Sequence, residues 1–355
     1  MELTITIVLF GFLLFMAVVV GRQRDLFSAA MLTGIFSLVS AALFTVMDAV
    51  DVAFTEAAVG AGISTVLFLA TLALTDEREQ RPESFPWIAV AVVSVTGAAL
   101  LYGTFDMPAF GDPNAPIHTG VAHHYVSESW NEIGLPNIVT GVLASYRGYD
   151  TFGELAVIFT AGVGVTLLLG SGAPAITEET PTIPQKSRAP YVREMPIVRS
   201  VTKALIPFVL LFALYVQAHG DFGPGGGFQA GVIFTAGLIL YALVWGPGAL
   251  ERFIRRRLVE RGMAIGVLLY GGVGVATQIL GGRFLEYGVL TPEHPEHGQH
   301  YGIFLVELGV GITVSAVMLV VFYVFASRRR LVQNAEQLNL PFPLMPEGRP
   351  KRRKR

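Results

Sequence analysis

The chain has 355 residues, of which 52% are hydrophobic and only 15% are charged, and its formal net charge is −2. Ordinary soluble domains carry about 25% charged residues, so this composition excludes a typical soluble enzyme. The absence of cysteine excludes disulfide bonds, thiolate metal sites, iron–sulfur ligation and a cysteine nucleophile.

The apolar residues are gathered in long runs. Runs of about 18 or more apolar residues can cross a hydrocarbon core roughly 30 Å thick. In lipid each run must be a helix, because its backbone has to satisfy its own hydrogen bonds. We therefore predict an all-α, polytopic integral membrane protein with about nine transmembrane helices. The predicted spans are Leu3–Val20, Leu26–Met47, Val52–Leu74, Phe85–Tyr102, Phe152–Leu169, Ala204–Ala218, Phe228–Trp245, Met263–Leu280 and Ile303–Ala326.

The basic residues give this topology an orientation. If the N-terminus lies outside, every Lys and Arg except Arg147 and Arg283 falls in a cytoplasmic loop or in the C-terminal segment. Cytoplasmic loops of membrane proteins carry an excess of Lys and Arg. We therefore predict an external N-terminus and a cytoplasmic C-terminus in a prokaryotic inner membrane.

Three segments outside the spans have distinct compositions. Ser171–Lys203 is polar and proline-rich, which predicts a cytoplasmic linker between two membrane modules. Within the external segment Gly103–Thr151, the stretch Tyr125–Arg147 mixes apolar and polar residues. That mixture predicts a helix lying along the membrane surface or against a partner protein. Leu331–Arg355 ends in five basic residues and is predicted to be a solvated cytoplasmic tail that anchors the topology.

Three carboxylates lie inside predicted spans: Glu56, Glu154 and Glu307. An ionisable group in the hydrocarbon region usually faces the interior of a helix bundle or water, and often marks an ion or proton path. The alternative is structural. Each Glu is predicted within about two turns of the N-terminus of its helix, where free N–H groups and the helix dipole stabilise a carboxylate without transport.

The glycine-rich stretch that follows His219 joins two predicted spans. Helical backbone is costly for the consecutive residues Gly223, Pro224, Gly225, Gly226 and Gly227. One interpretation is a re-entrant break whose backbone groups line an ion path, with His219 and Gln229 as polar contacts. The other is a tight external turn that packs closely against a neighbouring protein of a complex.

The histidines all fall on the predicted external side. His294, His297 and His300 are three residues apart, a spacing that permits a metal site. Because Pro292 and Pro295 interrupt this stretch, we expect no fixed helical register. We therefore predict that these are loop histidines titrating near neutral pH, with no metal bound.

The segment His219–Gly231 (HGDFGPGGGFQAG) resembles the signature loop of the MnhB/MrpB family, the B subunit of Mrp-type Na⁺/H⁺ antiporters. The likeness continues through Glu307–Gly311, although Asp221 stands where the family usually has a second histidine. Asp51–Gly60 looks like the MbhD-type module, and Pro136–Glu154 looks like the MbhE-type module; in long A-type antiporter subunits these two modules form the C-terminal end. The resemblance thus implies an MbhD-like module with three spans (1–80), an MbhE-like module with two spans (81–170), a linker (171–203), an MnhB/MrpB-like module with four spans (204–330) and a basic tail (331–355).

This resemblance implies a function. The chain is expected to be a membrane subunit of a multisubunit Na⁺/proton antiporter that contributes carboxylates to the ion path and docks the proton-pumping subunits. Its lysines all lie in cytoplasmic segments, which argues against this chain being the main pump. The implied partners are A-, C-, D-, E-, F- and G-type subunits and the lipid bilayer, with Na⁺ and H⁺ transported, no bound cofactor, no nucleic acid and no enzymatic activity. Two alternatives stay open: a purely structural or assembly protein, and a membrane-arm subunit of a hydrogenase-like or other respiratory redox complex.

Overall fold

The computed structural model describes residues 2–72, 78–79, 87–109, 111–169 and 196–337. Within these ranges, nine helices are long and apolar enough to cross a membrane. The prediction of a helical, multi-pass membrane protein is confirmed for this part of the chain. Most of the predicted linker and the last residues of the predicted tail lie outside the described residues.

The described elements follow one another as helices and short helical turns. They are α1 (Glu2–Arg22), α2 (Leu26–Val46), α3 (Val50–Glu56), η1 (Ala57–Ser64), α4 (Thr65–Leu72), α5 (Trp87–Gly103), η2 (Thr104–Asp106), α6 (Pro116–Thr119), α7 (Val121–Glu132), α8 (Ile138–Gly141), η3 (Val142–Tyr146), α9 (Gly148–Leu169), α10 (Pro196–His219), α11 (Gly227–Trp245), α12 (Pro247–Phe253), α13 (Arg256–Ile279), η5 (Tyr287–Leu290) and α14 (Pro295–Gln337).

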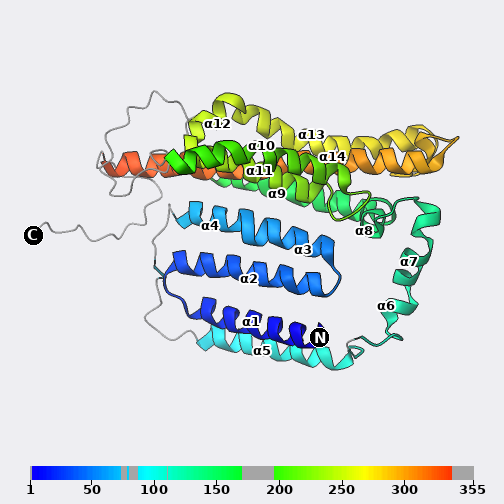
Figure 1. Ribbon diagram of the computed structural model, residues 1–355, viewed down its shortest axis with the longest axis horizontal. Helices are drawn as coiled ribbons and strands as arrows, with labels where there is room; N and C mark the ends of the chain where they lie inside the picture. The colour runs from blue at the N-terminus through cyan, green and yellow to red at the C-terminus, as the bar shows by residue number, and fades with distance from the viewer. Residues whose placement is uncertain (1, 73–77, 80–86, 110, 170–195, 338–355) are drawn as a thin grey trace, which may run out of the picture.

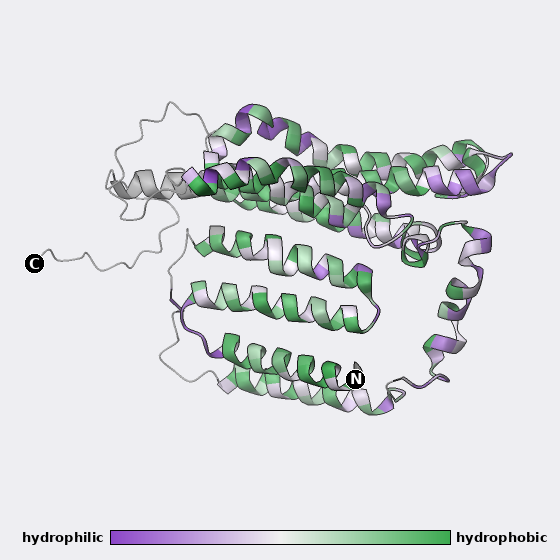
Figure 2. Ribbon diagram, in the orientation of Figure 1, coloured by the Kyte–Doolittle hydropathy of each residue, from purple (hydrophilic) through white to green (hydrophobic). Residues whose placement is uncertain are grey.

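The long helices form a bundle and a layer with nearly parallel axes (Figure 1). Helices α9 to α14 make the bundle, and α14 is its centre. In its apolar 18-residue stretch 67% of the residues are buried, whereas the corresponding stretches of α1 and α5 contain no buried residue. Helices α1 to α4 form the layer beside it. The start of α1 and the end of α14 lie at opposite ends of the long helices, and hydrophilic residues gather at the helix ends (Figure 2). Which end faces the cytoplasm stays a prediction.

The connection between α5 and α9 runs across the ends of the spans. These two consecutive spans lie on opposite sides of the α1–α4 layer, and α6 and α7 cross between them, perpendicular to the long helices (Figure 1). Buried tyrosines dock the far end of this connection on the bundle. The Tyr287 hydroxyl donates to the Ala144 carbonyl and the Tyr270 hydroxyl donates to the Gly148 carbonyl, each with an oxygen–oxygen distance of 2.8 Å. The crosswise direction of α7 fits the interfacial helix predicted over Tyr125–Arg147.

The third span is not a uniform α-helix. It runs through α3, η1 and α4, and η1 is a π-helix of eight residues. Gly60 lies in η1, where an added Cβ would collide with the Ser37 hydroxyl of α2. The glycine therefore lets the widened turn approach α2. π-Helical turns of this kind are rare and frequently occur at functional sites.

Helix α10 begins earlier than predicted. The apolar run predicts a span from Ala204, whereas the helix starts at Pro196. Proline at the first helical position costs no hydrogen bond, because that N–H would have no intrahelical partner. The last residues of the predicted linker are therefore the first turns of α10, and the span is not short.

Candidate functional site

A compact turn of residues 220–226 connects α10 to α11 at one end of the bundle, and we call it the 220–226 turn. The Gly226 N–H donates to the Val216 carbonyl over 3.2 Å, which folds the turn back on α10. Gly226 has φ 116°, a left-handed conformation that favours glycine. A Cβ on Gly225 would lie 2.7 Å from the Val216 oxygen. The glycines thus permit a tight helix–helix turn that packs against its own chain.

The segment before α8 holds the turn from one side. The Asn137 side-chain amide donates to the carbonyls of Gly220 and Gly223 over 3.0 and 2.9 Å. The Thr140 hydroxyl donates to the same Gly220 carbonyl over 2.7 Å. Asn137 also caps α8, because its Oδ1 accepts from the backbone N–H of Val139 over 3.0 Å. One buried asparagine therefore fixes both a helix start and the turn.

Helix α3 holds the turn from a second side. The Asp51 carboxylate accepts a hydrogen bond from the Gly225 N–H over 3.3 Å. One turn further along α3, the Thr55 hydroxyl accepts from the Gln229 side-chain amide over 2.9 Å. Gln229 is buried and belongs to the first turn of α11. These bonds join the first-layer helix α3 to the C-terminal bundle.

Glu307 on α14 approaches the turn from a third side. Its Oε2 accepts from the Gly227 N–H, the first residue of α11, over 2.5 Å. A Cβ on Gly226 would lie 2.9 Å from the same oxygen, and a Cβ on Gly227 would collide with the Glu307 backbone carbonyl. Close contact between glycine and α14 therefore brings the carboxylate to the N-terminus of α11, where the helix dipole favours negative charge.

This arrangement corrects one expectation for Glu307. The sequence places it within two turns of the start of its own helix, but α14 starts at Pro295, about three turns earlier. The expectation is wrong because polar residues 295–302 extend the helix beyond the apolar run. The helix N-terminus that stabilises Glu307 belongs to α11 instead.

Glu56 lies at the junction of α3 and the π-helix η1. It is partly buried, and its Oε1 is 2.9 Å from the position that a Cβ on Gly60 would occupy. Ser37 of α2 lies beside the same glycine. No hydrogen bond joins the Glu56 carboxylate to another residue in the described ranges, so its charge is not satisfied by a protein donor there.

Asp221 of the 220–226 turn forms an ion pair with His300 of α14. Oδ2 of Asp221 lies 2.5 Å from Nδ1 of His300. Asp221 is only 4% exposed, and burial raises the pKa of its carboxyl, an effect that the neighbouring His300 opposes. His300 is therefore not a loop histidine without a fixed register. Pro295 begins α14 rather than interrupting it, so His297 and His300 lie on a helix.

The two remaining predicted site residues differ in position: His219 contacts the turn, and Glu154 does not. The His219 ring stacks on Tyr215 with centroids 4.9 Å apart, and its Nε2 lies over Gly223. Glu154 is exposed on α9. The structure thus gathers Glu307, Gln229 and the glycines around the turn, while Glu154 does not join them. The described residues contain no group of three His, Asp or Glu side chains able to hold a metal.

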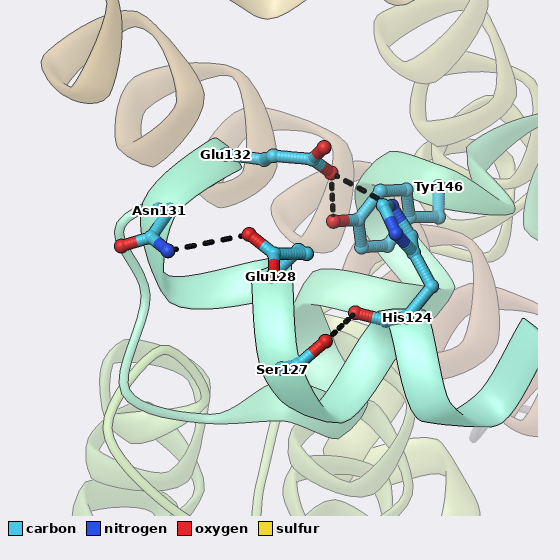
Figure 3. Close-up of polar contacts among 6 residues, drawn as sticks. All are labelled: His124, Ser127, Glu128, Asn131, Glu132 and Tyr146. Carbon is cyan, nitrogen blue, oxygen red and sulfur yellow. Dashed lines mark hydrogen bonds and ion pairs between the residues drawn. The ribbon is translucent and has the colours of Figure 1, made fainter.

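A second polar network joins α7 to η3 (Figure 3). Tyr146 donates its hydroxyl to Glu132, and His124 Nε2 lies 3.3 Å from the same carboxylate oxygen. The hydrogen bond from Tyr146 lowers the pKa of the Glu132 carboxyl. The pKa of Tyr146 is raised, mainly by burial of its hydroxyl and secondly by the hydrogen bond to Glu132. The Asn131 amide donates to Glu128 over 3.3 Å. This network is exposed, and we interpret it as a structural contact that holds α7 against η3.

Sequence reasoning missed several residues of the site. Asp51, Thr55, Asn137, Thr140 and His300 all contact the turn or its ends. Asn137 carried a local signal, since Asn before a helix start is a favoured N-cap. The others lie far from the turn in sequence, and no local pattern identifies them.

Comparisons with known protein families cover most of the chain. Residues 197–320 match the family described as a domain related to the MnhB subunit of Na⁺/H⁺ antiporter. Residues 11–77 match the family of MBH D subunits (MbhD), and residues 87–187 match the family of MBH E subunits (MbhE). The exact module bounds given by the sequence stay predictions.

Individual relatives point in the same direction. A protein of Rhizobium meliloti, named as the probable A/B subunit of a K⁺/H⁺ antiporter, is 26% identical over 317 residues, which are 82% of this chain and 31% of the relative. A putative antiporter subunit mnhB2 of Staphylococcus aureus is 33% identical over 129 residues, which are 35% of this chain and 89% of the relative. This chain therefore spans about a third of the Rhizobium relative and most of the Staphylococcus one.

Two solved structures share the fold. The Mrp complex from a Dietzia strain contains a chain that superimposes with a TM-score of 0.71 at 22% identity, over 90% of this chain and 34% of that one. The membrane-bound sulfane sulfur reductase, an archaeal respiratory membrane complex, contains a chain that superimposes with a TM-score of 0.52 at 26% identity. That match covers 67% of this chain and 96% of the other.

Proposed function

This chain belongs to the MnhB family of Na⁺/H⁺ antiporter subunits through its C-terminal part, and we propose that it is a membrane subunit of a multisubunit cation/proton antiporter. The family resemblance read from the sequence is thereby confirmed. The proposal extends to the whole chain, because the likeness to the Rhizobium A/B-type relative covers 82% of this chain, which is more than the MnhB part alone.

One observation carries the proposal: side chains from α3, α8 and α14 converge on the 220–226 turn. The carboxylates of Asp51 and Glu307 accept from N–H groups two residues apart in the chain, while Glu56 lies nearby in sequence without a donor in the described ranges. Carboxylates suit ion exchange, since they bind either a proton or a hard cation that prefers oxygen ligands. We propose that Glu56 and Glu307 contribute to a path for the cation or proton.

The remaining parts of the proposal concern place and partners. The basic loop pattern supports a prokaryotic inner membrane with the 220–226 turn on the external side. The apolar stretches of α1 and α5 contain no residue buried within this chain. Their exposure supports the proposal that they contact lipid or further subunits of the A, C, D, E, F and G types. Na⁺ is our proposed cation, with K⁺ as the competitor suggested by the Rhizobium relative's name.

The experiment measures antiport in everted vesicles that contain the complete complex, with a ΔpH-sensitive dye and added Na⁺ or K⁺. We expect Glu56→Gln and Glu307→Gln each to reduce the cation-dependent signal strongly, with the other subunits still co-purifying. Glu293→Gln is the matched control, because Glu293 is an exposed carboxylate just before α14. Unchanged antiport in an assembled complex that carries Glu56→Gln and Glu307→Gln would favour a purely structural role.

A second candidate function is that of a membrane-arm subunit in a respiratory redox complex. The likeness to the sulfane sulfur reductase complex favours it, because that match covers 96% of the solved chain. Co-purification separates the two functions. Antiporter-type subunits without redox proteins support the first, and proteins with iron–sulfur clusters support the second.

A further inference from the structure

A narrow apolar groove runs along the bundle between α10 and α13. Its volume is about 290 Å³, and its floor is formed by α11 and α14. The Ser315 hydroxyl in the lining donates to the Gly231 carbonyl over 3.0 Å, so it offers no free donor. Representative lining side chains are Ala213, Leu214, Phe234, Leu258, Ile312 and Ala316.

The size of the groove indicates what fits into it. Its lining on α14 extends from Leu308 to Leu319, a length of about 16 Å at 1.5 Å per residue. This length and the apolar lining suit a long, flexible apolar chain.

Basic side chains flank the groove at one end. On α10, Lys203 lies about three helical turns before Leu214, and Arg199 about five turns before Gln217, so both share the face that lines the groove. On the opposite wall, Arg261 lies three residues after Leu258 on α13, and Arg255 is the residue just before this helix begins.

These four basic residues are exposed, and none forms an ion pair within the part of the chain that the structure describes. Their neighbour Arg256 differs, since its Nε lies 2.8 Å from Glu260. The Tyr323 hydroxyl donates to the Ile254 carbonyl over 3.0 Å, which fixes the start of α13 beside α14. Figure 1 places the starts of α10 and α13 at the same end of the bundle, and Figure 2 shows hydrophilic residues there.

We propose that this groove is a binding site for one anionic phospholipid. An acyl chain lies along the apolar floor, and the headgroup phosphate lies between Arg199 and Lys203 on one wall and Arg255 and Arg261 on the other. Basic pockets between transmembrane helices are suited to anionic headgroups, because each Lys or Arg near the surface attracts anionic lipid. The site is separate from the 220–226 turn, and the proposal does not depend on the transported ion.

The test uses the purified full chain in phosphatidylcholine nanodiscs with a trace of spin-labelled phosphatidylglycerol, and separately with spin-labelled phosphatidylcholine. Electron paramagnetic resonance measures the immobilised fraction. We expect immobilised phosphatidylglycerol in excess over phosphatidylcholine. Arg199→Gln/Lys203→Gln and Arg255→Gln/Arg261→Gln should each weaken its retention by on the order of tenfold. Arg22→Gln/Arg24→Gln, which removes two charges at the turn before α2, should leave it unchanged.

A second variant tests the apolar part of the site. Ile312→Trp fills the groove while keeping all basic residues, and we expect it to abolish the immobilised fraction. Leu268→Trp, on an exposed α13 position outside the groove, is the control. Equal retention of both lipids, or no change in any of the charge and filling variants, overturns the proposal. It is also overturned if the assembled complex covers the groove with another polypeptide and retains no lipid there.

Discussion

Gln229 on α11 donates its side-chain amide to the Thr55 hydroxyl on α3 over 2.9 Å, and this bond joins the first helical layer to the C-terminal bundle. The two residues are far apart in the chain, and Gln229 is buried. Leaving either group without a partner inside the bundle carries a free-energy cost, whereas replacing both with apolar groups removes the need for a partner.

We therefore expect Thr55→Val to destabilise the protein by about 0.6–1.7 kcal/mol, the range for hydrogen bonds between transmembrane helices. The double variant Thr55→Val/Gln229→Leu should recover part of this loss. Thermal unfolding in nanodiscs measures the effect, and a double-variant cycle isolates the pair. Strictly additive single losses would show that the two side chains do not interact.

Asn137→Ala should release the 220–226 turn. The substitution removes two hydrogen bonds to the turn and the cap of α8; the Gly223 carbonyl loses its side-chain donor, while the Gly220 carbonyl keeps the bond from Thr140. We expect a loss of about 1–3 kcal/mol. Hydrogen exchange at the turn should rise with it. Asn131→Ala is the control, because that side chain bonds only to Glu128 on the exposed face of α7 (Figure 3); equal effects in the two variants would contradict the assigned role.

Gly226→Ala should disturb the site more than Gly281→Ala. Both glycines have positive φ, 116° and 92°, so both substitutions strain the backbone, by about 1–3 kcal/mol. Only at Gly226 does the new Cβ meet the Glu307 carboxylate, since Gly281 has open space around it. Comparing thermal stability and antiport of the two variants separates backbone strain from displacement of Glu307. Identical behaviour would argue against the close contact.

The titration of Asp221 should make the stability of the protein depend on pH. Its folded pKa is raised above the ordinary value of 3.8, chiefly by burial, so the folded state binds more protons than the unfolded state just above that pH. Stability from this group is therefore complete below about pH 4 and falls as pH rises through the folded pKa. Asp221→Asn should flatten this part of the profile of unfolding temperature against pH. A profile unchanged by the substitution would show that another group is responsible.

The spans are predicted well from the sequence because each one depends on local properties. A helix in lipid satisfies its own backbone hydrogen bonds, and its length can be counted from the run of apolar residues. Helix starts are predicted less well. Pro196 and Pro295 read as breaks, yet each begins a helix that extends past the apolar run. Hydropathy describes where a helix meets lipid, not where it ends.

The site is only partly predictable for a different reason. Glu307, Gln229 and the glycines stand out by residue type in apolar surroundings. Their partner Asp51 does not, and Asn137 shows only the signal of an N-cap residue, because long-range pairing depends on how the helices pack. The helix dipole that stabilises Glu307 likewise comes from α11, which no reading of α14 alone could show.

The crosswise connection through α6 and α7 also affects how the complex is built. Because one polypeptide carries both α3 and α11, the bond between Thr55 and Gln229 forms within one chain and does not depend on the protein concentration. Equal stoichiometry of the layer and the bundle then follows from translation of a single message. A cell that makes this chain has no orphan copy of either part to degrade.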